Sequence, residues 1–186
     1  MGKNFTYVDN SNVFIEGQRV SAVTLGQAES IVDAMNRRII DYGWRLDYGA
    51  LHEIACGQPD EIGAAYLWGS PPPGDSFWER VERYGFRVTT YERNVAGKEK
   101  KVDVAIAHQI TKDAYSGVIR KGVDEITLVA GDKDYVPVVR DLVAGGHVFD
   151  VVFWSHAARE LKEAGSSFVS LDKYLGVLTK RWTPKA

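Results

Sequence analysis

The sequence predicts an α/β fold, a mainly parallel sheet of five or six strands with helices on both faces. Five short segments are apolar at nearly every position, as in strands that are buried on both faces. Segments with helical periodicity lie between them. Strands and helices that alternate in this way form parallel sheets with right-handed crossovers, so the chain should be a layered α/β domain.

The predicted strands are short and end at residues that favour turns. They cover residues 5–8 (FTYV), 64–68 (AAYLW), 86–91 (FRVTTY), 126–130 (ITLVA) and 148–154. The first is followed by Asp-Asn-Ser-Asn, the second by a Gly-Ser-Pro-rich segment and the fourth by Gly-Asp. The carboxyl ends of these strands therefore define the edge of the sheet where polar residues are concentrated.

The predicted helices have apolar residues three or four positions apart. Thr24 and Gln27 have the spacing of an N-terminal capping box, so we expect a helix that starts there and stops at Gly43. Further helices are expected over residues 47–56, 75–84, 101–119, 135–144 and 156–164. Several of these segments are followed by glycine, which commonly ends a helix.

The composition suits one ordinary domain. The chain has 186 residues, a formal net charge of −2 and a single cysteine, Cys56, which excludes an internal disulfide and a cysteine-based zinc site. We expect one domain over residues 1–178 and a basic tail over 179–186. Any surface that binds nucleic acid must be local. The apolar runs are too short to span a membrane and no signal peptide is visible, so we expect a cytoplasmic protein.

Four aspartates occupy the ends of predicted strands or the starts of predicted helices. Asp9 follows the first strand, Asp132 and Asp134 follow the fourth, and Asp103 begins the helix after the third. Ligands of open parallel sheets bind beyond the carboxyl ends of the strands, so these side chains should converge. Carboxylates this close repel one another unless a cation lies among them, and oxygen ligands favour Mg²⁺ or Mn²⁺. The alternative is that they only cap helices or form a turn.

Three segments resemble the signature segments of the NYN domain family of PIN-like ribonucleases. They are YVDNSN (residues 7–12), KKVDVAIA (100–107) and TLVAGDKDYVPVV (127–139). The resemblance implies a PIN-like three-layer α/β/α sandwich with strand order 3-2-1-4-5. It also implies a divalent-metal site that hydrolyses RNA phosphodiester bonds. Carried over by position, the catalytic and metal-binding residues would be Asp9, Asp103, Asp132 and Asp134, with Asn10 and Asn12 lining the site.

The resulting prediction is a metal-dependent ribonuclease, with endonuclease and exonuclease action both left open. Bound Mg²⁺ or Mn²⁺ would neutralise charge on the phosphoryl oxygens and lower the pKa of the attacking water, and one carboxylate would accept a proton from it. The residues expected to bind substrate are Asn10, Ser11, Asn12, Arg93, Lys98, Lys100 and Lys101. The four basic residues lie in the connection that leads to Asp103, where they can contact phosphates. Trp68 and Trp154 would stack on bases or pack in the core.

Other classes of protein match less well. A phosphatase with Asp-x-Asp after the first strand would differ from Asp9-Asn10-Ser11, and a receiver domain would need an aspartate where Tyr91-Glu92-Arg93 stands. The remaining alternative is a non-catalytic regulatory module that binds RNA or protein on the same fold. As partner we expect RNA, single-stranded or in structured loops, and no membrane. A homodimer stays open as an alternative to a monomer.

Overall fold

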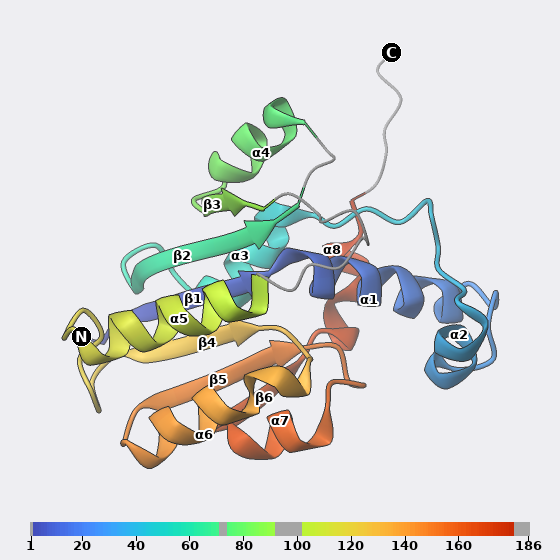
Figure 1. Ribbon diagram of the computed structural model, residues 1–186. Coiled ribbons are helices and arrows are strands. Elements are labelled where there is room, and N and C mark those ends of the chain that lie inside the picture. Colours follow the sequence, from blue (N-terminus) through green and yellow to red (C-terminus); the bar gives the residue numbers. More distant parts are fainter. Residues whose placement is uncertain (1, 71–73, 92–101, 181–186) are drawn as a thin grey trace.

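The computed structural model describes residues 2–70, 74–91 and 102–180. Six strands form one sheet in the order β3-β2-β1-β4-β5-β6, and every neighbouring pair is parallel (Figure 1). The strands are β1 (Asn4–Asp9), β2 (Ile62–Gly69), β3 (Arg87–Thr90), β4 (Glu125–Val129), β5 (Val148–Phe153) and β6 (Ser167–Ser170). The predicted fold class and strand order are confirmed, with β6 extending the sheet beyond β5.

Helices cover both faces of the sheet and make a three-layer sandwich. The helices are α1 (Asn10–Thr24), α2 (Ile31–Arg37), α3 (Tyr48–Cys56), α4 (Asp75–Glu82), α5 (Val102–Tyr115), α6 (Val136–Ala144), α7 (Arg159–Ala164) and α8 (Leu175–Leu178). Two short 3-10 helices are η1 (Lys133–Tyr135) and η2 (Asp172–Tyr174). Helices α5, α6 and α7 pack on one face, and α1, α3 and α8 pack on the other (Figure 1).

The strands are apolar on both sides because each face of the sheet is buried under helices. In β1, Tyr7 belongs to the core under α5, whereas the next residue, Val8, belongs to the core under α1. Thr6, a buried polar residue in the middle of this strand, is hydrogen-bonded, because its hydroxyl donates to the carbonyl of Ala55 at 3.1 Å. This arrangement explains the nearly continuous apolar runs that identified the strands.

The prediction for the first helical region was wrong. The chain enters α1 directly after β1 and leaves it at Thr24, whose hydroxyl donates to the carbonyl of Val20 and so does not open a helix. Helix α2 begins instead after Ser30, which accepts a hydrogen bond from the Asp33 amide at 3.1 Å. The polar run after Asp9 looked like a turn, but the side chain of Asp9 caps α1 and permits the helix to start at once.

The later helices are confirmed, with ends that differ by a few residues. Helix α5 stops at Tyr115, before the predicted end at residue 119, so Val118 lies beyond the helix and is exposed. At the other end of the chain, Thr179 accepts a hydrogen bond from the Trp44 indole, and the Lys180 amide donates to the carbonyl of Arg45. The first two residues of the expected tail therefore contact the domain. None of the described helices is both long and apolar enough to cross a membrane.

Candidate active site

Asp9 is buried at the junction where β1 ends and α1 begins. One carboxylate oxygen, Oδ1, accepts a hydrogen bond from the Asn12 amide at 3.1 Å and so caps the helix. The other, Oδ2, accepts from the hydroxyl of Tyr135 at 3.1 Å. The side chain is 4% exposed, and the positive end of α1 favours its negative charge. Asp9 is therefore a fixed, preorganised carboxylate at the carboxyl edge of the sheet.

The Tyr135 hydroxyl connects Asp9 to Asp103. It lies 3.3 Å from Oδ1 of Asp103, which occupies the first turn of α5. A tyrosine hydroxyl has one proton, so it donates to one carboxylate at a time. Burial, followed by the charges of Asp9 and Asp103, raises the pKa of Tyr135 well above its ordinary value, and the hydroxyl therefore stays protonated. Two carboxylates from distant parts of the chain thus meet at one buried donor.

Asp132 and Asp134 add negative charge to the same place. Both are exposed and follow β4, and Oδ1 of Asp132 accepts from the Asp134 amide at 3.1 Å, which caps η1. Burial raises the pKa of Asp103, the hydrogen bond from the Tyr135 hydroxyl lowers it, and the charges of Asp132 and Asp134 raise it further. The structure therefore brings the other three predicted aspartates within electrostatic reach of Asp103.

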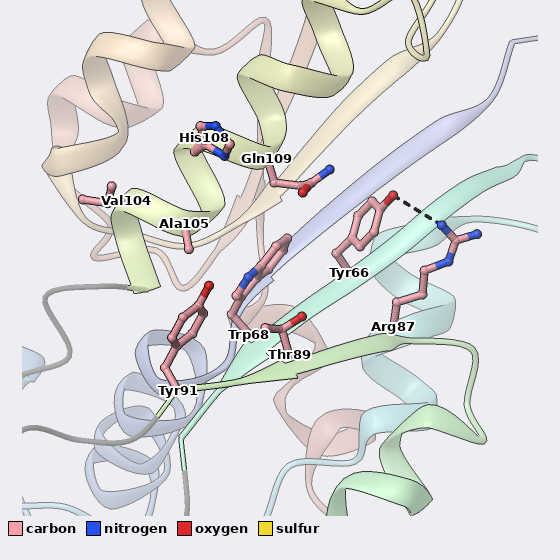
Figure 2. A pocket seen from close by; sticks show the side chains of 9 residues that line it. All are labelled: Tyr66, Trp68, Arg87, Thr89, Tyr91, Val104, Ala105, His108 and Gln109. Carbon is pink, nitrogen blue, oxygen red and sulfur yellow. Dashed lines mark hydrogen bonds between the residues drawn. The ribbon is translucent and has the colours of Figure 1, made fainter.

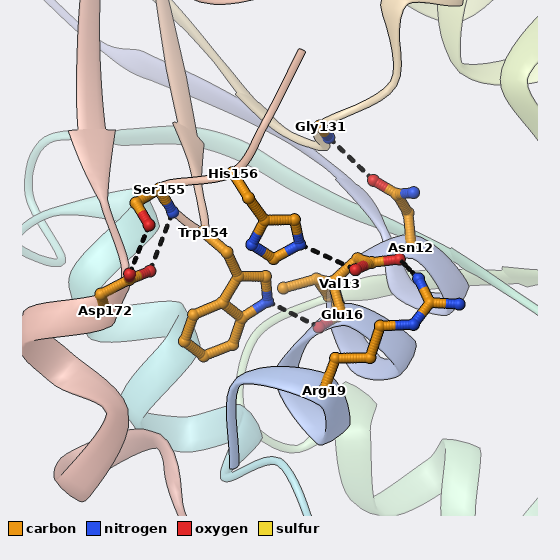
Figure 3. Close-up of polar contacts among 9 residues, drawn as sticks. All are labelled: Asn12, Val13, Glu16, Arg19, Gly131, Trp154, Ser155, His156 and Asp172. Atoms are coloured by element: carbon orange, nitrogen blue, oxygen red, sulfur yellow. Dashed lines mark hydrogen bonds and ion pairs between the residues drawn. The ribbon is translucent and has the colours of Figure 1, made fainter. Parts of the chain in front are cut away.

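Asn12 holds the loop that carries Asp132. Its Oδ1 accepts a hydrogen bond from the Gly131 amide at 2.8 Å, which joins the first turn of α1 to the end of β4 (Figure 3). Gly131 also lies against the ring of Phe153, since a Cβ atom on it would come within 2.2 Å of two ring carbons. Asn12, which was predicted to line the site, therefore positions the backbone of Gly131 next to Asp132.

The start of α1 is also fixed to the end of β5. The His156 ring contacts a carboxylate oxygen of Glu16 at 2.7 Å, and the Trp154 indole donates to the carbonyl of Val13 at 2.9 Å (Figure 3). Trp154 is completely buried, so its ring packs in the core and is not accessible for stacking on a base. These contacts make the edge that carries Asp9 and Asp132 a rigid platform.

A groove runs between α5, where Val104 and Ala105 border it, and the strands β2 and β3. It has a volume of about 510 Å³ and is bordered by the rings of Tyr66, Trp68 and Tyr91 (Figure 2). The Arg87 guanidinium lies 5.4 Å from the centre of the Tyr66 ring. Trp68 is 4% exposed and packs mainly in the core, whereas Tyr66 and Tyr91 are half-buried. The groove therefore offers aromatic surface beside α5, the helix whose first turn carries Asp103.

The other predicted site residues are placed differently. Asn10 accepts a hydrogen bond from the Tyr48 hydroxyl at 2.7 Å, and together with Ser11 it lines a second pocket. The four basic residues of the predicted phosphate-binding connection lie outside the described residues: Arg93, Lys98, Lys100 and Lys101. Sequence reasoning missed Tyr135 as a site residue, although its place directly after Gly-Asp-Lys-Asp was a usable signal.

The donor chemistry of the site fits a hard divalent cation. Within the described ranges, no three or more His, Cys, Asp or Glu side chains form a group arranged to hold a metal ion as it stands. The carboxylates of Asp9 and Asp103 nevertheless meet at one hydroxyl, and the charges of Asp132 and Asp134 raise the pKa of Asp103. Oxygen donors that repel one another are the environment that Mg²⁺ or Mn²⁺ stabilises.

Comparison with known proteins agrees with this architecture. The family model of the NYN domain matches residues 10–172. The crystal structure of a protein of unknown function from Vibrio parahaemolyticus is similar, with a TM-score of 0.65 and 18% sequence identity over 91% of this chain and 93% of that chain. That likeness shows the shared fold. No curated protein matches the chain. Because the family model covers most of its length, the chain belongs to the NYN domain family.

Proposed function

We propose that the protein is a divalent-metal-dependent ribonuclease that hydrolyses RNA phosphodiester bonds. The observation that carries this proposal is the meeting of Asp9 and Asp103 at the Tyr135 hydroxyl, with Asp132 and Asp134 close enough to raise the pKa of Asp103. Membership of the NYN domain family, a PIN-like nuclease family, supports the same reading. In this proposal the four aspartates hold Mg²⁺ or Mn²⁺.

Each side chain has a role that follows from its surroundings. Asp9 and Asp132 would be the principal metal ligands, because each is fixed by the backbone amide that it caps. A bound divalent cation supplies charge neutralisation at the phosphate and a lower pKa for the attacking water. Asp134 is exposed and its carboxylate has no hydrogen bond among the described residues, so it is available to accept a proton from that water. Tyr135 would orient Asp9 and Asp103.

The shape beside the carboxylates favours a single-stranded substrate. The groove between α5 and the strands β2 and β3 presents the half-buried rings of Tyr66 and Tyr91, with Arg87 over Tyr66. Unpaired bases stack on aromatic side chains, whereas bases inside a duplex are not accessible to them. A binding module without catalysis would use the same groove, so cleavage itself has to be measured.

The experiment is cleavage of end-labelled single-stranded RNA, with the DNA of the same sequence as a comparison. We expect cleavage with Mn²⁺ or Mg²⁺, none with EDTA, and a loss of about 100-fold or more in Asp132→Asn, the size typical of removing a group that stabilises the transition state. Asp60→Asn is a matched control, because Asp60 is exposed and lies before β2 at the opposite edge of the sheet. RNA that is bound but never cut would overturn the proposal in favour of a binding module.

A further inference from the structure

A second pocket lies on the other side of the β1–α1 junction from the aromatic groove. It has a volume of about 460 Å³, and Asn10 and Ser11, the two residues after Asp9, form part of its wall. Residues of α3 and α4 and the segment around Arg45 complete it. The pocket therefore lies at the β1–α1 junction that also carries Asp9, but it has a different lining from the groove.

The lining carries positive charge without compensation. Arg45, Arg80 and Lys180 border the pocket, and no acidic side chain does. All three are exposed, and none pairs with a carboxylate in the described part of the chain. Arg45 donates to the backbone carbonyls of Tyr42 and Trp44, which fix the guanidinium but leave its charge intact. Such a cluster beside an acidic site attracts an anion.

A buried hydroxyl in the same wall has no hydrogen-bond partner in the part of the chain that the structure describes. Ser70 follows β2 and is 4% exposed, yet its Oγ makes no hydrogen bond within the described residues. Buried polar atoms are nearly always bonded, so an orphaned hydroxyl at a pocket needs an explanation. A ligand oxygen that enters the pocket would supply the missing partner.

Aromatic rings make up much of the remaining wall. Phe77 and Tyr84 of the α4 region and Tyr48 of α3 border the pocket, and the Tyr48 and Phe77 rings meet edge to face with centres 5.5 Å apart. A pocket that is lined by both cationic side chains and aromatic rings suits a ligand that combines a phosphate with a planar base.

We propose that this pocket binds one nucleotide of the RNA strand, adjacent to the bond that is cut. Its phosphate would lie against Arg45, Arg80 and Lys180, its oxygen atoms would accept from Ser70, and its base would pack on Tyr84 or Phe77. The inference rests on the proposed function, because it assigns the strand a path from the carboxylates into the pocket. The lining of this pocket would then help to determine which RNA the protein binds.

The test is binding of a fluorescently labelled single-stranded RNA in EDTA, where no metal-dependent cleavage takes place. The double substitution Arg45→Gln and Arg80→Gln should weaken binding by about 10- to 100-fold and lower the salt dependence by roughly one unit per lost phosphate contact. Arg83→Gln is the matched control, because Arg83 lies next to α4 and is exposed but does not line the pocket. Equal affinity of the double variant and the control would overturn the proposal.

Two further variants test the hydroxyl and the ring. Ser70→Ala should weaken RNA binding by about 5-fold or more without lowering the melting temperature, because it removes a hydroxyl that has no hydrogen-bond partner within the described ranges. Tyr84→Ser should abolish the preference for an intact RNA over one with an abasic nucleotide. The nucleotide site would be refuted if these variants bound RNA as the wild type does. It would also be refuted if inorganic polyphosphate competed for the pocket as well as RNA does. RNA held by the pocket but never cut would refute only the proposed cleavage.

Discussion

Replacing Tyr135 by phenylalanine isolates the contact on which the candidate site depends. The substitution keeps the buried ring and removes the hydroxyl that lies 3.1 Å from Asp9 and 3.3 Å from Asp103. A hydrogen bond to a charged group contributes about 1.5–3 kcal/mol to stability. For a chain of this size that corresponds to a fall of about 3–12 °C in melting temperature without metal. Without the donor, two neighbouring carboxylates are left to repel each other.

The effect of metal on the melting temperature of Tyr135→Phe distinguishes repulsion between carboxylates from a defect in packing. A divalent cation between Asp9 and Asp103 would neutralise the repulsion that the hydroxyl had relieved. We therefore expect saturating Mn²⁺ to raise the melting temperature of Tyr135→Phe by more than that of the wild type. The assay is differential scanning fluorimetry over a series of Mn²⁺ concentrations, with a chelated sample as reference.

Tyr115→Phe provides the matched control. The Tyr115 hydroxyl also donates to a carboxylate, that of Asp141 at 2.7 Å, but the pair is exposed. An exposed contact of this kind contributes little, so the change should shift the melting temperature by no more than about 2 °C and should not depend on metal. A Tyr135→Phe variant that melted at the wild-type temperature would refute the role of this hydroxyl. So would a fall in melting temperature that was the same with and without Mn²⁺.

Three further predictions concern the supports of the site and the fold. Asn12→Ala should slow RNA cleavage by about 10-fold or more, measured as kcat, because the Gly131 amide loses its acceptor beside Asp132. Gly131→Ala should cost about 1–3 kcal/mol in urea unfolding, because the new Cβ would overlap a buried ring. Asp124→Ala should cost about 2–4 kcal/mol at pH 7, because its carboxylate accepts from the Arg120 amide and guanidinium.

The Asp124 prediction carries a pH dependence with a definite sign. Hydrogen bonds from Arg120 hold the pKa of Asp124 well below its ordinary value, so the stabilisation is complete above about pH 4 and is lost as the pH falls below it. The difference between wild type and Asp124→Ala should therefore shrink between pH 4 and pH 2. If the stability difference between wild type and Asp124→Ala stayed constant over this range, it would contradict the role given to the Arg120–Asp124 pair. For the other variant, wild-type activity in Asn12→Ala would contradict the positioning role of the Asn12 side chain.

Strand positions and the edge that carries the aspartates were predictable from the sequence. The strands are buried on both faces, so their apolar runs are unbroken and end abruptly at Asp9 and Gly131. Strand ends in a parallel sheet lie on one side, and this topological rule was enough to place Asp9 and Asp132 at a common edge. The confirmed strand order needed the family resemblance, because apolar patterns do not reveal which strands are neighbours.

The errors came where local and tertiary signals compete. Asn, Ser and Asp favour turns in isolation, yet the run after Asp9 enters α1 because the Asp9 side chain caps the helix. Strand β6 was missed because it has four residues and serine at both ends. The contact of Tyr135 with Asp9 and Asp103 joins three segments and has no local signature. Such contacts become visible only when the packed structure is known.

The most direct test of the central claim is to locate the cation. Crystals of the full chain grown with Mn²⁺ would show it by anomalous scattering. We predict a peak within about 2.5 Å of carboxylate oxygens of Asp9 and of at least one of Asp103, Asp132 and Asp134, and its loss in crystals of Asp9→Asn. Full occupancy of Mn²⁺ elsewhere on the chain, with none at these carboxylates, would contradict the proposed metal-dependent site.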